Sequence, residues 1–120
     1  MARILIVDDS IVSRSNLRRI LEEAGHEVAG EAGDGASGLE QYGQLRPDLV
    51  TMDITMPGMS GLDCLKGIME KDPSAKVVMM TAIGQGPKIM EALESGACHY
   101  VTKPFETSKV VEAISDVLCS

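Results

Sequence analysis

Several short apolar stretches of this sequence end in a side chain that carries an acid, a hydroxyl or an amine. The residues at these ends are Asp8, Asp9, Asp53, Thr81 and Lys103. Carboxylates that lie close together repel one another, and burial makes their ionisation more costly, so a group of them needs a cation. Their oxygens are hard ligands that suit Mg²⁺. An aspartate beside Mg²⁺, a hydroxyl and an ammonium has the groups needed to accept a phosphoryl group.

This chemistry requires that residues far apart in the chain meet in one place. Asp53 is the best candidate for the nucleophile, because it follows the most central apolar stretch, 49–52. Asp8 and Asp9 would lie on one side of it, and Thr81 and Lys103 on the other. The alternative is an acidic, solvated edge whose polar residues are unrelated helix caps and turn residues.

The elements that would position these residues alternate along the chain. Apolar runs predict strands, and apolar residues at helical spacing follow each run. The predicted strands cover residues 4–7, 27–32, 49–53, 77–81 and 99–102. Ser10 and Ser60 are candidate caps of the first and third helices, and Gly25 and Gly96 are expected to end the first and fourth. The fourth helical pattern extends to Ala97.

Five strand–helix repeats predict an α/β fold with a doubly wound, five-stranded parallel sheet flanked by five helices. Right-handed crossovers leave few topologies, of which the flavodoxin-like order 2-1-3-4-5 is favoured. In a parallel sheet the carboxyl ends of all strands share one edge. Strands one and three flank the switch point, where a crevice opens. We therefore expect the five polar residues to converge there.

Composition limits the function classes. The 120 residues fit one domain, 1–120, and we expect a monomer. The net charge of −7 and an aromatic content of 2% without Trp argue against nucleic-acid binding. The three cysteines show no C-x-x-C spacing, so reduced thiols are expected and a zinc site is not. No signal peptide or apolar run of about 20 residues is present, which predicts a cytoplasmic protein without membrane insertion.

Four segments carry a resemblance to a known family: ILIVDDS, VTMDITMPGMSG, MMTA and YVTKPF. In their order and spacing the sequence resembles the receiver domain of two-component response regulators, over the whole chain. Among receivers it is most similar to the single-domain form that acts in chemotaxis. The resemblance implies signalling by phosphorylation, with a CheA-like histidine kinase as the donor.

The resemblance also implies the roles of the acidic residues. Asp53 would accept the phosphoryl group from the kinase. Mg²⁺ would be bound by Asp9, Asp53 and the backbone carbonyl of Thr55, with Asp8 contributing through water. The residue types by themselves already make Mg²⁺ binding and phosphorylation of an aspartate chemically plausible at this site.

Thr81 and Lys103 would contact the phosphoryl oxygens, and Tyr100 occupies the position of the family's switch aromatic. Movement of Thr81 would let Tyr100 change the face formed by helix four, strand five and helix five. That face would bind a flagellar switch protein or another downstream target. Without the resemblance, Tyr100 is better interpreted as a strand aromatic that packs on the core. The resemblance also predicts a cis Lys103–Pro104 peptide.

An enzyme is the first alternative. Aspartyl phosphatases of the haloacid-dehalogenase type need an acid two residues after the nucleophile, as a general acid and base. Thr55 occupies that position here, which favours a switch with slow self-dephosphorylation over an enzyme. The apolar Ile83, two residues after Thr81, predicts the same slow hydrolysis.

Three further alternatives remain. Residues 33–38 match G-x-G-x-x-G, with Asp53 about twenty residues on, as in dinucleotide-binding domains. The motif follows the second predicted strand rather than the first, which favours a plain turn into helix two with Gly35 near its cap. The chain could also serve a phosphorelay outside chemotaxis, or be a degenerate receiver that only mediates protein contacts.

Overall fold

The computed structural model describes residues 2–82 and 84–119 and forms a five-stranded parallel sheet. Its strand order is β2-β1-β3-β4-β5, which confirms the predicted topology. The strands are β1 (Arg3–Val7), β2 (Glu27–Ala32), β3 (Leu49–Asp53), β4 (Val77–Thr81) and β5 (His99–Thr102). Their bounds agree with the predicted ones to within one residue.

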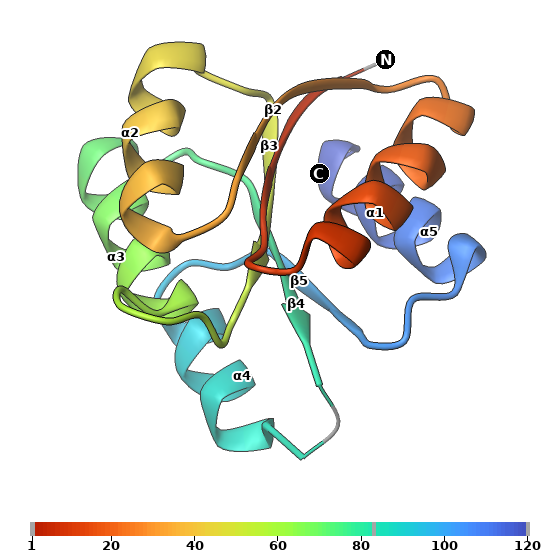
Figure 1. The fold of residues 1–120 in the computed structure, drawn as a ribbon. Coiled ribbons are helices and arrows are strands. Elements are labelled where there is room, and N and C mark those ends of the chain that lie inside the picture. The colour runs from red at the N-terminus through yellow and green to blue at the C-terminus, as the bar shows by residue number, and fades with distance from the viewer. Residues whose placement is uncertain (1, 83, 120) are drawn as a thin grey trace.

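Helices cover both faces of this sheet (Figure 1). They are α1 (Ile11–Glu23), α2 (Gly35–Leu45), α3 (Gly61–Lys71), α4 (Gly86–Glu94) and α5 (Thr107–Leu118). One layer contains α2, α3 and α4, and the other contains α1 and α5. The chain therefore has the predicted doubly wound α/β fold.

Two apolar cores result, one on each face of the sheet. Leu5 and Val7 of β1 point to the α2–α4 layer, whereas Ile4 and Ile6 point to the α1–α5 layer. Because both faces are covered, the central strands are expected to be mostly apolar. Every residue of β3 and β4 is buried. Asp53 and Thr81 are thus polar residues at the ends of two fully buried strands.

Local signals set the helix ends largely as expected. Ser10 caps α1 and Ser60 caps α3. Each hydroxyl accepts a hydrogen bond from the backbone N–H of the residue three positions later. Gly25 follows α1 at φ +89°, a conformation that side chains rarely adopt. Asp34, just before Gly35, caps α2.

The fourth helix is shorter than its pattern indicated. It ends at Glu94, and a turn through Gly96 at φ +115° places Ala97 beyond the helix. Ala97 nevertheless packs in the core of the α2–α4 layer, which is why it continued the apolar pattern. Within residues 2–82 and 84–119, none of the helices is long and apolar enough to span a membrane.

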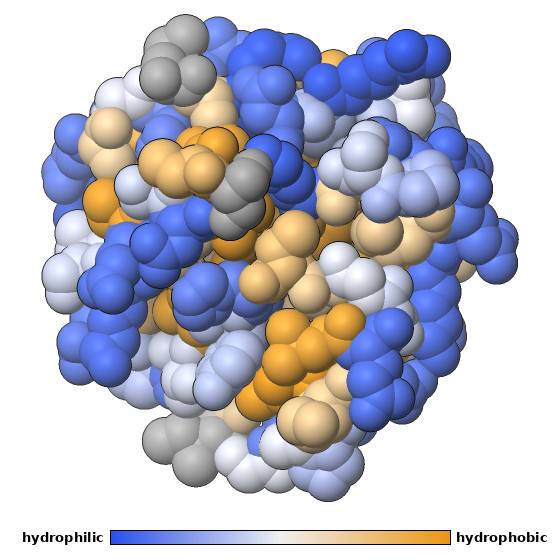
Figure 2. Space-filling model, turned by 180° about the vertical axis from the view of Figure 1, so that it is seen from behind, coloured by the Kyte–Doolittle hydropathy of each residue, from blue (hydrophilic) through white to orange (hydrophobic). Residues whose placement is uncertain are grey.

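The surface is hydrophilic apart from local apolar patches, one of which is visible in the rear view of Figure 2. Large apolar side chains are exposed at the start of α1 and on the α4–β5 side of the described structure. They are Ile11, Val12, Met90, Leu93 and Tyr100.

Candidate functional site

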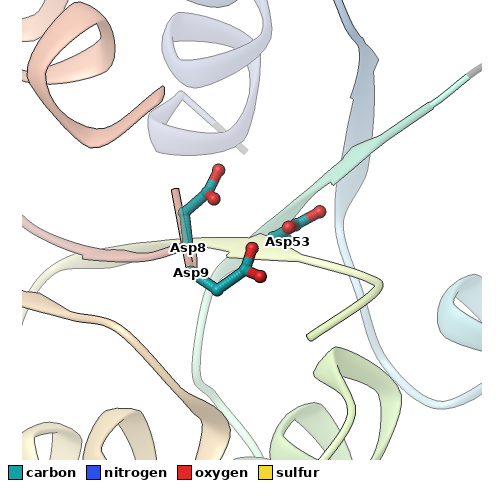
Figure 3. Close-up of side chains that lie close together, drawn as sticks. All are labelled: Asp8, Asp9 and Asp53. Atoms are coloured by element: carbon teal, nitrogen blue, oxygen red, sulfur yellow. The ribbon is translucent and has the colours of Figure 1, made fainter. Parts of the chain in front are cut away.

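Three carboxylates meet at the carboxyl edge of the sheet. Oxygen atoms of Asp8, Asp9 and Asp53 lie within 4.8 Å of one another (Figure 3). Asp8 and Asp9 follow β1, and Asp53 ends β3, the strand that pairs directly with β1. The predicted convergence at the switch point is therefore confirmed for the acidic residues.

Lys103 joins this group from the end of β5. Its Nζ lies 3.1 Å from Oδ2 of Asp8 and 3.5 Å from Oδ2 of Asp53. The Lys103–Pro104 peptide is cis, as predicted. The backbone N–H of Lys103 donates to the carbonyl of Thr81, which ties the end of β5 to the end of β4. The ammonium is thus presented to two carboxylates at once.

The charges of this site do not balance. Asp8 and Asp53 are buried, Asp9 is exposed, and Lys103 supplies one positive charge against three carboxylates. Burial raises the pKa of Asp53 to about 6, against the opposing effect of Lys103, and the charges of Asp8 and Asp9 add to the rise. A cation bound between these oxygens would relieve both the repulsion and the cost of burial.

The loop that leaves β3 folds back over Asp53. A side chain at Gly61, the first residue of α3, would collide with the backbone carbonyl of Asp53. The N–H of Gly61 also donates to the carbonyl of Ile54 at 2.8 Å. Gly58 turns the loop at φ +73°. The two glycines of PGMSG therefore have different reasons: Gly61 lets the start of α3 pack directly on the aspartate, and Gly58 allows the positive φ of the turn.

Arg14 on α1 holds the acidic loop and was not predicted. Its Nη1 donates to the backbone carbonyl of Asp8 at 2.6 Å, and its Nε pairs with Glu31 of β2 at 3.2 Å. A second bond runs from the N–H of Ser10 to the Asp8 carboxylate. The guanidinium thus fixes the backbone between two metal-ligand candidates. The only sequence signal was an arginine one turn into α1, on the helix after the two aspartates.

A side-chain bridge crosses the other side of the site. The Thr81 hydroxyl is fully buried and donates towards the carbonyl of Ala82 (3.1 Å) and Oε1 of Gln85 (3.0 Å). Nε2 of Gln85 donates to the hydroxyl of Thr55 at 2.8 Å. Gln85 was not among the predicted site residues. Ile83, whose apolar side chain was expected to slow hydrolysis, lies outside the described residues.

Tyr100 lies on β5 and does not pack in the core. Its side chain is 43% exposed, and its ring is tilted against that of His99 with the centroids 6.1 Å apart. A hollow between β5 and α5 begins beside it and is lined in part by Lys109 and Glu112. The interpretation of Tyr100 as a core aromatic is therefore wrong.

Two of the three glycines of the G-x-G-x-x-G match are explained by packing. A side chain at Gly35 would meet the backbone carbonyl of Met59 at 2.7 Å, and one at Gly38 would meet Val7 at 2.9 Å. Both glycines let α2 approach its neighbours closely. The motif also follows β2, not the first strand of the sheet, as the sequence indicated.

Comparison of the sequence with known protein families gives a match that is consistent with the geometry of this site. A family model described as the response regulator receiver domain matches residues 4–115. The chain belongs to the family of response regulator receiver domains.

Individual relatives and solved structures show which receiver-domain proteins the chain is similar to. The chain is 50% identical to chemotaxis protein CheY of Thermotoga maritima, over 96% of both chains. It is also 51% identical to protein CcdB of Bacillus subtilis, over 98% of both. Among solved structures, it matches a CheX–CheY–BeF3–Mg²⁺ complex from Borrelia burgdorferi with a TM-score of 0.92 and 36% identity, covering 96% of this chain and 87% of that one.

Proposed function

We propose that residues 1–120 act as a phosphorylation-activated receiver in which Asp53 accepts a phosphoryl group from a histidine kinase. The observation that carries this proposal is the meeting of three carboxylates and Lys103 around the end of β3. Membership of the receiver family supports it. The arrangement offers a nucleophile, a cation site and an ammonium within a few ångströms.

Mg²⁺ is the cation that these residues fit. Oxygen atoms of Asp8, Asp9 and Asp53 lie within 4.8 Å of one another and are hard donors, which suits Mg²⁺ better than softer metals. The backbone carbonyl of Thr55 would add a further protein oxygen, and Asp8 would contribute through a water molecule. When bound, Mg²⁺ would neutralise negative charge on the carboxylates and on the incoming phosphoryl group.

Transfer would proceed at the Asp53 carboxylate. One of its oxygens attacks the phosphorus of phosphohistidine, an O–P bond forms and the N–P bond breaks. The histidine nitrogen keeps the electron pair and takes up a proton. Above its pKa of about 6 Asp53 is ionised and can attack. Lys103 is placed to offset the added charge, and the hydroxyl of Thr81 to donate to a phosphoryl oxygen.

The product of this reaction stays on the chain, so the protein acts as a switch rather than as an enzyme that releases product. Thr55 provides no general acid or base two residues after Asp53. We therefore propose slow self-dephosphorylation. Release of many phosphates per chain from a small phosphomonoester would instead indicate a phosphatase.

The output surface would be the face of α4, β5 and α5. Met90, Leu93 and Tyr100 are exposed there, and the hollow between β5 and α5 adjoins Tyr100. Movement of Thr81 towards the phosphoryl group would shift the balance between two arrangements of this face. We propose a CheA-like histidine kinase as the donor, a flagellar switch protein or another downstream target as the partner of this face, and action as a monomer in the cytoplasm. Relatives named chemotaxis protein CheY support a role in chemotaxis.

Phosphorylation of Asp53 is tested directly by labelling. Wild-type protein incubated with acetyl phosphate and Mg²⁺ should gain one phosphoryl group per chain in intact-mass spectra. Asp53→Asn should abolish the gain, because the amide is not a nucleophile at neutral pH. The exposed Asp63→Asn is the control and should label normally. Equal labelling of Asp53→Asn would place the acceptor elsewhere.

Arg14→Lys is expected to weaken Mg²⁺ binding by about threefold to tenfold. Lysine keeps the charge but lacks the fork that reaches both the Asp8 carbonyl and Glu31, so the acidic loop loses one charged hydrogen bond. Calorimetric titration with MgCl₂ measures the dissociation constant.

The matched control for this change is Arg19→Lys on the same helix. Arg19 is more exposed, and its guanidinium pairs with Asn16 and Glu23 of the same helix. Its replacement should leave Mg²⁺ affinity unchanged. Equal losses in the two variants would mean that the effect is general to α1, and no loss in Arg14→Lys would remove its role in positioning Asp8.

A further inference from the structure

Gln85 joins two loops that flank Asp53. It lies between β4 and α4, whereas Thr55 lies in the loop after β3, thirty residues away in the chain. The Gln85 amide contacts the hydroxyl of Thr81 at 3.0 Å and that of Thr55 at 2.8 Å. In this arrangement the Thr81 hydroxyl donates to Oε1 of Gln85, and Nε2 of Gln85 donates to the Thr55 hydroxyl.

Within the described residues, the side chain of Gln85 makes its hydrogen bonds to Thr81 and Thr55. It occupies the cap position before α4 but makes no capping hydrogen bond to the helix. Serine and threonine hydroxyls have one proton each. While the proton of Thr81 is directed to Gln85 or to the Ala82 carbonyl, it is not directed to Asp53.

We infer that Gln85 is a positioning residue that holds Thr81 in its resting arrangement and so opposes phosphorylation-induced switching. The inference rests on the proposed function. A phosphoryl group on Asp53 needs the proton of Thr81, so it must compete with Gln85 for it. Release of Gln85 also breaks the link to Thr55 and frees the start of α4 from the loop after β3.

Removal of this bridge should favour the phosphorylated arrangement. The resting state loses about one net hydrogen bond in Gln85→Ala, so the balance of states should move by about threefold to tenfold. The variant should therefore bind the phosphoryl analogue beryllofluoride, in the presence of Mg²⁺, about threefold to tenfold more tightly than wild type.

A double-mutant cycle with Thr81→Ala separates this role from a general effect on α4. Without the Thr81 hydroxyl there is nothing for Gln85 to hold, so Gln85→Ala should bring no gain in that background. Titration with beryllofluoride at saturating Mg²⁺, followed by amide NMR shifts, measures all four affinities. Gln44→Ala removes an exposed glutamine of α2 and should leave the affinity unchanged.

The beryllofluoride titrations distinguish failure of the proposed receiver function from failure of the role of Gln85. Failure of wild-type protein to bind beryllofluoride would overturn the proposed function. Normal binding by wild type with equal or weaker binding by Gln85→Ala would overturn the role of Gln85 alone. A gain that persists in the Thr81→Ala background would also overturn it, because the gain would not depend on Thr81.

Discussion

Asp53→Asn is expected to stabilise the protein at pH 7.5 by up to about 3 kcal/mol in the absence of divalent cations, and to have little effect at pH 4. Burial raises the pKa of Asp53 to about 6 from 3.8, against the opposing charge of Lys103. A difference of this size corresponds to about 3 kcal/mol between the ionised and neutral forms. Asparagine has a similar shape and cannot ionise.

The direction follows from proton uptake. Between pH 3.8 and about 6 the native state binds more protons at residue 53 than the unfolded chain does, so the free energy of unfolding falls as the pH rises through this window. Above pH 6 the full cost of the buried charge is present. The asparagine variant avoids this cost, so its advantage should grow from pH 4 to pH 6 and then stay constant.

Urea unfolding at a series of pH values measures this advantage. Glu70→Gln makes the same chemical change at an exposed position of α3 and should show no such pH-dependent gain. Saturating Mg²⁺ should reduce the difference between wild type and Asp53→Asn, since the cation offsets the same charge. An advantage that is independent of pH would mean that ionisation of Asp53 does not limit stability.

The sequence was sufficient for the fold and for the acidic group because both depend on short-range patterns and one topological rule. Buried parallel strands require continuous apolar residues, and their carboxyl ends share an edge. Once β1 and β3 are adjacent, Asp9 and Asp53 must lie near each other. The apolar pattern of α4 extended beyond the helix, because Ala97 packs in the same core without being helical.

The supporting residues could not be found in this way. Arg14 and Gln85 act through long, flexible side chains whose direction depends on tertiary contacts, with Glu31 in one case and Thr55 in the other. Gly61 carries no side chain at all, and its role appears only as the close approach of two backbone segments. Strand ends locate a site, whereas the groups that hold it in place are set by packing.

Lys103→Met is expected to lower the free energy of unfolding by about 1–3 kcal/mol at pH 7.5. The ammonium lies 3.1 Å from Asp8 and 3.5 Å from Asp53, and its removal leaves buried carboxylates without their cation. Loss of one partner of a fully buried pair costs about 3–5 kcal/mol. The side chain of Lys103 is 26% exposed, so solvent reduces that figure.

This loss should shrink at pH 5, where Asp53 is mostly protonated and needs a cation less. Mg²⁺ should stabilise Lys103→Met more than wild type, because no ammonium then competes for the same oxygens. Lys66→Met is the control: it removes an exposed lysine whose pair with Glu91 lies outside the site, and neither pH nor Mg²⁺ should alter its effect. If Mg²⁺ stabilises wild type as much as Lys103→Met, then the Lys103 ammonium does not compete with Mg²⁺ for the same carboxylate oxygens. Other groups must then offset the negative charge around Asp53.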